Sequence, residues 1–187
     1  MENQYTYGAE LLKKYEGFNK TAVWDVAAWR IGYGSGTITF DNGTFRTTKK
    51  GDVTTKENAT KDLTRRVKEF EKKLIKKIGA EFWEPLNYKV KAALISYAYN
   101  YGNIIHSKLI EAIKTGNNKI IADTLIKETY NDNKKLSSGV RQALRNRRAK
   151  EAQIIKEAPQ TTTTKKNNYK MLAIPLIIIG AFYLLKK

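Results

Sequence analysis

The sequence contains no cysteine and only one histidine, His106. The absence of cysteine excludes a disulfide framework, an all-cysteine zinc site and a thiol nucleophile. A zinc site built on histidine normally needs at least two of them, and a Ser-His-Asp triad would have to use this single one. We therefore interpret His106 as an ordinary loop or core residue, and we expect neither a metal site nor a cofactor.

Acidic residues are scarce as well. The chain has 18 Asp and Glu against 35 Lys and Arg in 187 residues, which gives a formal net charge of +17. A charge of this size attracts polyanions over a long range, so nucleic acid, anionic lipid and the bacterial cell wall are the classes of partner to consider. The length suits one globular domain with appendages.

Long apolar runs are nearly absent. Residues 1–8 are polar and show no secretory signal, so we do not expect export by that route. The exception is Met171–Leu185, fifteen residues without charge. As a helix they would reach roughly 22 Å, less than the ~30 Å of a hydrocarbon core, but Tyr169 and the flanking lysines extend this to a marginal span. We favour a membrane anchor over a terminal helix packed on protein, because no polar face interrupts the run.

Composition divides the chain into three parts. Residues 1–157 have the apolar periodicity of a folded domain. Residues 158–170 are rich in Thr, Lys and Asn and are typical of a polar linker. Residues 171–187 are predicted to form a C-terminal transmembrane or membrane-anchoring helix, and lysines at both of its ends leave its orientation open.

The first part of the domain combines a helix with strands. A short amphipathic helix is predicted over residues 9–16, ending at Gly17. Between Ala22 and Thr48, short runs of β-forming residues are broken by glycines, and Asn42-Gly43 is a strong hairpin signal. This segment is predicted to form a small antiparallel sheet.

The rest of the domain is predicted to be helical. A capping box at residues 54–57 begins a helix whose apolar residues recur at steps of three and four until Gly79. A second helix is expected over about residues 87–101, and shorter ones follow around residues 107–115, 119–129 and 138–157. The predicted fold class is therefore α+β, with a small antiparallel β lobe and a helical lobe followed by the linker and the apolar helix.

Two carboxylates have the character that cleavage of a glycosidic bond requires. One acid must stay protonated to protonate the leaving oxygen, and a second must be ionised. Glu16, at the end of the predicted helix, faces the negative end of the helix dipole and has Tyr15, Phe18 and Trp24 nearby in sequence, which disfavours its charged form. Asp25 is expected on or just after a strand, projecting into the same cleft. Because Glu-Gly at a helix end is common, periodicity alone leaves this pairing open.

The surrounding motifs carry a family resemblance. The stretch Leu12-Lys-Lys-Tyr-Glu-Gly-Phe18 is followed by Ala22-Val-Trp-Asp25 and by Trp29-Arg-Ile-Gly-Tyr-Gly34. This region resembles the active-site region of phage-type lysozymes, glycoside hydrolase family 24. There a glutamate is followed by eight residues and an aspartate, and then by a Thr-Ile-Gly-Tyr-Gly-His run; Glu16 and Asp25 have the same separation.

Three further stretches agree with that family in the same order. Residues 53–59 resemble the entry to its next helix, and residues 92–102 resemble its central helix. The family's C-terminal motif is matched by Gly139, Arg147, Arg148 and Glu151. The resemblance covers about residues 9–155. It implies a lysozyme-like, two-lobed fold and cleavage of the β-1,4 bond between N-acetylmuramic acid and N-acetylglucosamine, with Glu16 as general acid and Asp25 as its partner.

The sequence departs from the family at the third position of its site. Where the family has a threonine, this chain has Ile31 or, after a one-residue deletion, Arg30, and Ser35 stands at the histidine position. Ser35 or Thr37 would then hold the water, or the role is vacant. A vacant role favours a lytic transglycosylase, in which the 6-hydroxyl of the muramic acid attacks in place of water.

Four residues are predicted to bind substrate: Arg30, Ser35, Thr37 and Asn100. The alternatives are a solvated strand position for Arg30, a β-forming role for Thr37 and a helix cap for Asn100. The tryptophans Trp24, Trp29 and Trp83 are either sugar platforms or core residues.

These observations favour a phage muramidase or lytic transglycosylase that acts in host wall penetration or lysis. Peptidoglycan is the expected substrate, a lipid membrane the partner of residues 171–187, and other virion proteins are further candidate partners. The expected location is a phage virion membrane or the host bacterial membrane. The alternative is an inactive, basic structural protein on a lysozyme fold that binds membrane and nucleic acid. The spacing of Glu16 and Asp25 favours the enzyme, for which we do not expect nucleic acid as a partner.

Overall fold

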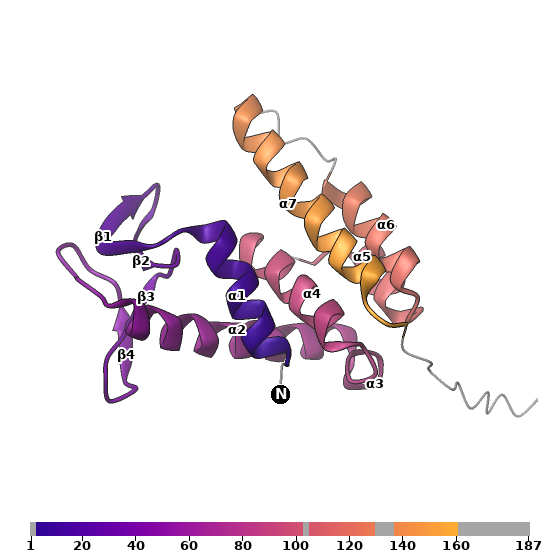
Figure 1. The fold of residues 1–187 in the computed structure, drawn as a ribbon, viewed down its shortest axis with the longest axis horizontal. Helices are drawn as coiled ribbons and strands as arrows, with labels where there is room; N and C mark the ends of the chain where they lie inside the picture. Colours follow the sequence, from indigo (N-terminus) through magenta and orange to yellow (C-terminus); the bar gives the residue numbers. More distant parts are fainter. Residues whose placement is uncertain (1–2, 103–104, 130–136, 161–187) are drawn as a thin grey trace, which may run out of the picture.

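The computed structural model describes residues 3–102, 105–129 and 137–160 (Figure 1). Helix α1 precedes four short strands, and further helices follow them. The elements are α1 (Gln4–Glu16), β1 (Asn19–Asp25), β2 (Ala28–Gly32), β3 (Thr37–Thr39), β4 (Phe45–Thr47), α2 (Lys56–Ile78), α3 (Ala80–Trp83), α4 (Tyr88–Asn100), α5 (Ser107–Lys114), α6 (Asn118–Thr129) and α7 (Ser138–Glu157).

The β lobe consists of two antiparallel pairs, β1 with β2 and β3 with β4. The turn between β3 and β4 contains the predicted Asn-Gly pair, and Gly43 there has a φ of 82°, which glycine adopts without strain. Ala22, Ile31 and Ile38 form a small core of their own between the strands. The prediction of an α+β fold with small antiparallel sheets is confirmed.

The first helix begins earlier than predicted, at Gln4 instead of residue 9. The side chain of Asn3 accepts hydrogen bonds from the backbone N–H groups of Tyr5 and Thr6, and Thr6 returns one to the Asn3 backbone, which completes a capping box. A cap of this kind satisfies amides that would otherwise lack partners and so fixes the start of a helix. The box uses Thr at a position where Glu or Gln is the usual signal, and for this reason the pattern was missed.

Helix α2 spans both lobes. Its N-cap is Thr55, whose side chain accepts from the backbone N–H of Asn58, and it ends at Gly79 with φ of 98°. The predicted apolar stripe is buried over its whole length, and it packs against β3 at one end and α3 at the other. In Figure 1, α2 runs along the base of the molecule from the strands to α3.

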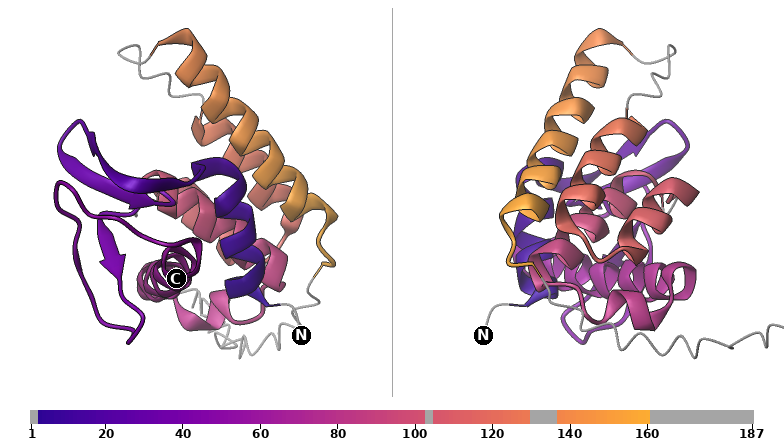
Figure 2. Two further views of the ribbon diagram at one scale, coloured as in Figure 1. Left: turned by 60° about the vertical axis from the view of Figure 1, so that its left-hand side comes forward. Right: turned by 90° about the vertical axis from the view of Figure 1, so that its right-hand side faces the viewer.

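Helix α4 is the centre of the helical lobe. Every residue from Val90 to Tyr99 is buried. The helix packs against α1, α2 and α7, while α5 and α6 complete the lobe on the far side from the strands (Figure 2). Because α1 contacts both α4 and α2, its C-terminal end, where Glu16 lies, is fixed at the junction of the two lobes.

The chain remains in contact with the domain as far as Gln160. Ala158 is buried, its carbonyl accepts from Asn118 Nδ2 at 2.9 Å, and the Gln160 side chain accepts from the Asn118 backbone N–H. The remainder of the predicted linker and the predicted helix over 171–187 lie outside the described residues. Within the ranges that the structure describes, no helix combines the length and apolar character needed to cross a membrane.

Candidate active site

Glu16 is the last residue of α1, and its carboxyl group lies between the two lobes. Gly17 ends the helix with φ of 65° and directs the chain into β1. The Glu16 side chain is 21% exposed, and its Oε1 accepts a hydrogen bond from Arg147 Nη1 at 2.8 Å. On the other side, a Cβ placed on Gly34 would lie 3.2 Å from Glu16 Oε2, so the carboxyl group rests against this glycine. The apolar shell expected from the sequence is thus replaced, on one side, by an ion pair.

Arg147 belongs to a buried group of charges centred on Glu151. Glu151 is fully buried and accepts from Ser96 Oγ at 2.6 Å and from Arg147 Nε at 3.3 Å. Arg148 Nη1 lies 2.9 Å from the other carboxylate oxygen. Burial raises the pKa of Glu151 and lowers the pKa of Arg148. Arg147 contacts the carboxylates of both Glu151 and Glu16. The contact with Glu151 therefore fixes the position of the guanidinium that faces Glu16.

Asp25 ends β1 at the tip of the first hairpin. It pairs with Ala28 of β2, its side chain is 61% exposed, and the turn between them places Val26 at a φ of 49°. Arg30, two residues further along β2, has its Nε 3.7 Å from Asp25 Oδ2. The structure therefore brings together Asp25 and Arg30, two of the residues selected from the sequence.

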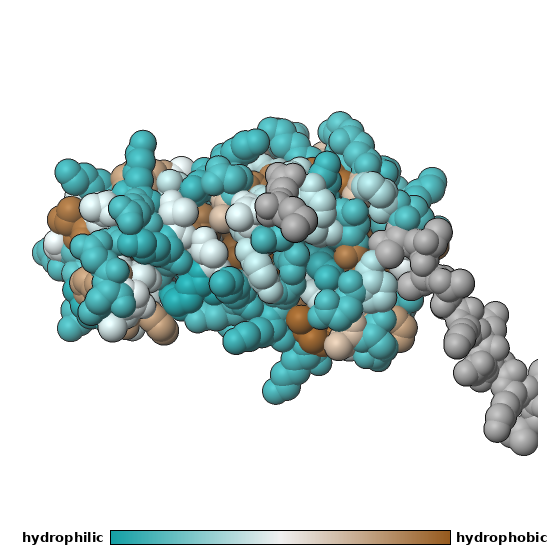
Figure 3. Space-filling view, turned by 60° about the horizontal axis from the view of Figure 1, so that its bottom comes forward, coloured by the Kyte–Doolittle hydropathy of each residue, from teal (hydrophilic) through white to brown (hydrophobic). Residues whose placement is uncertain are grey.

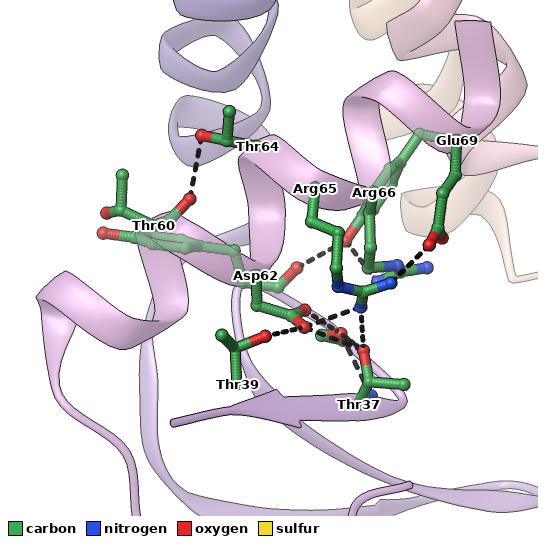
Figure 4. Close-up of polar contacts among 11 residues, drawn as sticks. Thr37, Thr39, Thr60, Asp62, Thr64, Arg65, Arg66 and Glu69 are labelled. Carbon is green, nitrogen blue, oxygen red and sulfur yellow. Dashed lines mark hydrogen bonds and ion pairs between the residues drawn. The ribbon is translucent and has the colours of Figure 1, made fainter. Parts of the chain in front are cut away.

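Thr37 belongs to a second polar network, around Asp62 of α2 (Figure 4). Ser35, which is buried, belongs to the same network. Ser35 Oγ donates to Asp62 Oδ2 at 2.5 Å, and Thr37 Oγ1 donates to Asp62 Oδ1 at 2.9 Å. Thr39 Oγ1 adds a third hydroxyl at 2.8 Å, and Arg65 Nη2 donates to both Asp62 and Thr37. These hydroxyls have partners within the protein and join β3 to α2. Their role in substrate binding stays a prediction.

Asp62 was not identified from the sequence. It is only 2% exposed, although aspartate is rarely buried without a partner. Asp62 lies three residues after Ala59 and one before Leu63, on the apolar stripe of α2. A charged residue at a core position of a strongly periodic helix is the signal from which this buried polar network could have been predicted.

Asn100 ends α4, and its Oδ1 accepts from Arg148 Nη2 at 3.2 Å. The side chain thus borders the charge group around Glu151, and a contact with substrate stays a prediction. Of the tryptophans, Trp83 is fully buried and donates to Glu71, so it is a core residue. Trp24 is 59% exposed and meets Trp29 edge-to-face with 5.5 Å between ring centroids.

The carboxyl groups of Glu16 and Asp25 make this arrangement suited to acid–base catalysis. Glu16 and Asp25 are carboxyl groups on either side of the junction between α1 and the first hairpin, and one is paired with Arg147 while the other faces Arg30. In the parts of the chain that the structure describes, no group of three or more His, Asp or Glu residues could hold a metal ion.

Comparison with known proteins gives one family and several related structures. A family model described as phage lysozyme matches residues 13–151. The endolysin from Escherichia coli O157:H7 phage FAHEc1 aligns with a TM-score of 0.63 at 28% identity, covering 80% of this chain and 90% of that one. The muramidase domain of SpmX from Asticaccaulis excentricus gives 0.60 at 21% identity, covering 82% and 96%. A mutant lysozyme of P22 gives 0.63 at 21% identity, covering 83% and 99%. No curated protein matches the chain.

Proposed function

The chain belongs to the phage lysozyme family, and from this premise we propose that it cleaves the glycan strands of peptidoglycan. The bond cut is the β-1,4 linkage between N-acetylmuramic acid and N-acetylglucosamine, as in glycoside hydrolase family 24. The observation that carries the proposal is the position of Glu16, held by Arg147 against Gly34 at the junction of the two lobes.

In this proposal the two carboxyl groups have separate roles. Glu16, in its protonated form, gives its proton to the oxygen of the leaving sugar. Asp25, ionised at the exposed tip of the hairpin, stabilises the positive charge that develops on the other sugar or activates a water molecule. Arg147 holds the Glu16 carboxyl group in place through the 2.8 Å hydrogen bond.

Whether a third residue positions a water molecule decides which of two products forms. The hydroxyls of Ser35 and Thr37 already donate to Asp62, and Arg30, which faces Asp25, has only N–H donors, so none of the three is free to accept a proton from water. Hydrolysis would leave reducing ends, whereas attack by the muramic acid 6-hydroxyl would leave 1,6-anhydro ends. Mass analysis of the released muropeptides separates the lysozyme from the lytic transglycosylase.

The central test is zymography on peptidoglycan with matched substitutions on α1. Glu16→Gln should reduce clearing by about 10²- to 10⁴-fold, the usual contribution of a general acid. Glu10→Gln, an exposed glutamate on the same helix that pairs with Lys13, should clear like the wild type. Clearing that survives Glu16→Gln would remove Glu16 from the mechanism. An inactive chain that binds duplex DNA, with affinity falling steeply as salt rises, would instead support the basic structural protein.

We further propose that residues 171–187 attach the enzyme to a membrane, either that of a phage virion or that of the host bacterium. The support is the uncharged run Met171–Leu185 between lysines and the net charge of +17, which favours anionic lipid. On the face shown in Figure 3, hydrophilic side chains predominate and hydrophobic ones form small separate patches, so this face offers no large apolar surface to a membrane. In a buffer of high ionic strength, which screens the attraction of the basic domain to anionic lipid, flotation with phosphatidylglycerol vesicles should carry the full chain but leave a chain ending at Gln160 behind. Equal flotation of both would overturn this assignment.

A further inference from the structure

The first hairpin presents two chemically different faces. In β1 and β2, Val23 pairs with Arg30, Trp24 with Trp29, and Asp25 with Ala28. Since side chains alternate between the faces of a strand and cross-strand partners share a face, Asp25 and Arg30 lie on one side and the two tryptophans on the other. Arg30 is therefore a diagonal neighbour of the proposed site carboxylate.

Arg30 lies directly over a glycine. A Cβ built on Gly36 would be 2.7 Å from Arg30 Nη1 and 3.9 Å from Arg30 Cζ, and no other heavy atom outside its chain neighbours comes within 4 Å of that position. The Gly36 carbonyl accepts from the backbone N–H of Thr48 at 2.9 Å, which fixes the backbone beneath the guanidinium. The guanidinium of Arg30 thus occupies space that a side chain at position 36 would otherwise fill.

We propose that Arg30 is a positioning residue for Asp25: its guanidinium, seated on Gly36, holds the Asp25 carboxylate in the orientation used for cleavage. The proposal rests on the proposed function. A guanidinium offers several fixed N–H donors but no acceptor and does not lose its proton, so Arg30 orients a carboxylate without taking a proton from water. Asp25 is then the group on that side of the bond that acts on the substrate.

The sharpest test is Gly36→Ala. Residue 36 does not have a positive φ, so alanine fits the backbone, and the added methyl group meets only the far end of a flexible side chain. The fold should therefore be unchanged while the guanidinium is displaced. Because small displacements at a site are costly, kcat on soluble glycan strands should fall about tenfold with KM and Tm unchanged. Gly139→Ala, which adds a methyl group in open space on α7, is the matched control and should keep wild-type kcat.

Substitutions of Arg30 decide whether the effect of Gly36→Ala passes through it. Arg30→Ala should lower kcat by about tenfold or more, and Arg30→Lys should restore part of the loss because it keeps the charge. Adding Gly36→Ala to Arg30→Ala should have no further effect, since the methyl group no longer displaces anything. Effects of the two substitutions that add, or a rise in KM with unchanged kcat, would overturn the positioning role and favour a direct contact of Arg30 with the glycan.

A measurement that needs no activity separates this inference from the proposed function. The Nε–H resonance of Arg30 should shift in both Asp25→Asn and Gly36→Ala, and it should not shift in Gly139→Ala. If the wild type and Glu16→Gln are equally inactive but the resonance shifts as expected, the function fails and the arrangement of Arg30 stands. If the wild type is active but the resonance does not respond, the function stands and the seat on Gly36 is wrong.

Discussion

Each lobe contains a buried carboxylate, and the two carboxylates have different sets of hydrogen-bond and ion-pair partners. Asp62, which joins the β lobe to α2, accepts from three hydroxyl groups and one arginine. Glu151, in the helical lobe, accepts from one hydroxyl group and faces two arginines, Arg147 and Arg148. Both carboxylates are almost completely buried, so each depends on its partners to offset the loss of water.

The difference lies in where the arginines of each network lead. Around Asp62 the buried carboxylate meets one guanidinium and three neutral hydroxyls, and the same guanidinium also pairs with Glu69, a partly exposed carboxylate of the same helix. Around Glu151 two guanidiniums meet one buried carboxylate, and the excess positive charge is the one that reaches Glu16. The Asp62 network thus ends at a partly exposed carboxylate of its own helix, whereas the Glu151 network extends through Arg147 to the proposed general acid.

The largest effect should come from removing the centre of the helical-lobe network. Glu151→Ala would leave Arg147 and Arg148 buried without their counter-charge, and it should cost about 3–5 kcal/mol of unfolding free energy. Chemical denaturation measures this directly. Glu157→Ala, at an exposed position of the same helix, should change the unfolding free energy by less than about 0.5 kcal/mol. Similar losses in both variants would mean that the charge group around Glu151 does not stabilise the lobe.

A smaller and more local effect is expected in the β lobe. Asp62→Ala removes the acceptor of the Ser35, Thr37 and Thr39 hydroxyls and should cost about 2–3 kcal/mol. Hydrogen exchange should show the loss mainly in β3 and β4, with α4 protected as in the wild type. Asp41→Ala, an exposed position in the turn between β3 and β4, serves as the control. Equal loss of protection in α4 would show that the two networks are not independent.

Replacing one arginine of each network by lysine should affect the rate of cleavage in one network and not in the other. Arg147→Lys keeps the charge but cannot reach both Glu16 and Glu151 with a planar fork, so kcat should fall about tenfold. Arg65→Lys, the equivalent change in the Asp62 network, should leave kcat unchanged because Arg65 contacts Thr37 and Asp62 and does not contact Glu16. The measurement is the rate of glycan cleavage by folded protein at saturating substrate. Equal losses of rate would remove the functional distinction between the networks.

The smallest effect on stability should come from Asp123, a partly exposed carboxylate, and this effect should depend on pH. Lys119 of α6 and Lys156 of α7 hydrogen-bond to Asp123 and lower its pKa to about 2. A carboxyl group with a lowered pKa stabilises the fold above its ordinary pKa, and this contribution is lost as pH falls from about 4 to 2. The Tm difference between wild type and Asp123→Asn should therefore be small at neutral pH and vanish near pH 2. A difference that grows on acidification would contradict the assignment.

Local patterns predicted much of the fold. The end of α1 at Gly17, the Asn42-Gly43 turn and the apolar stripe of α2 follow from backbone stereochemistry and helical periodicity, which depend on a few neighbouring residues. Glu16 and Asp25 were selected because their separation matches that of the phage lysozyme family; local periodicity alone left the pairing open. The early start of α1 was missed because its cap uses an atypical residue pair.

The side-chain contacts around the proposed site could not be predicted from such local patterns. Arg147 is 131 positions from Glu16, and Asp62 is 27 from Ser35. Nothing in the local sequence shows that the hydroxyls of Ser35 and Thr37 donate to an aspartate of α2. The Arg147, Arg148 and Glu151 motif was noted by resemblance, but the residues that it contacts were not foreseen.

The sequence by itself determined the class of elements and their order, and its family resemblance selected Glu16 and Asp25 as the carboxylates of the proposed site. Only the tertiary structure decided which distant groups compensate the charges: Arg147 pairs with Glu16, and the hydroxyls of Ser35, Thr37 and Thr39 donate to Asp62. The physical reason is the sequence separation over which each kind of interaction acts. Turns and helices are set by hydrogen bonds over three or four residues, while the pairing of a buried charge depends on which distant elements packing brings into contact.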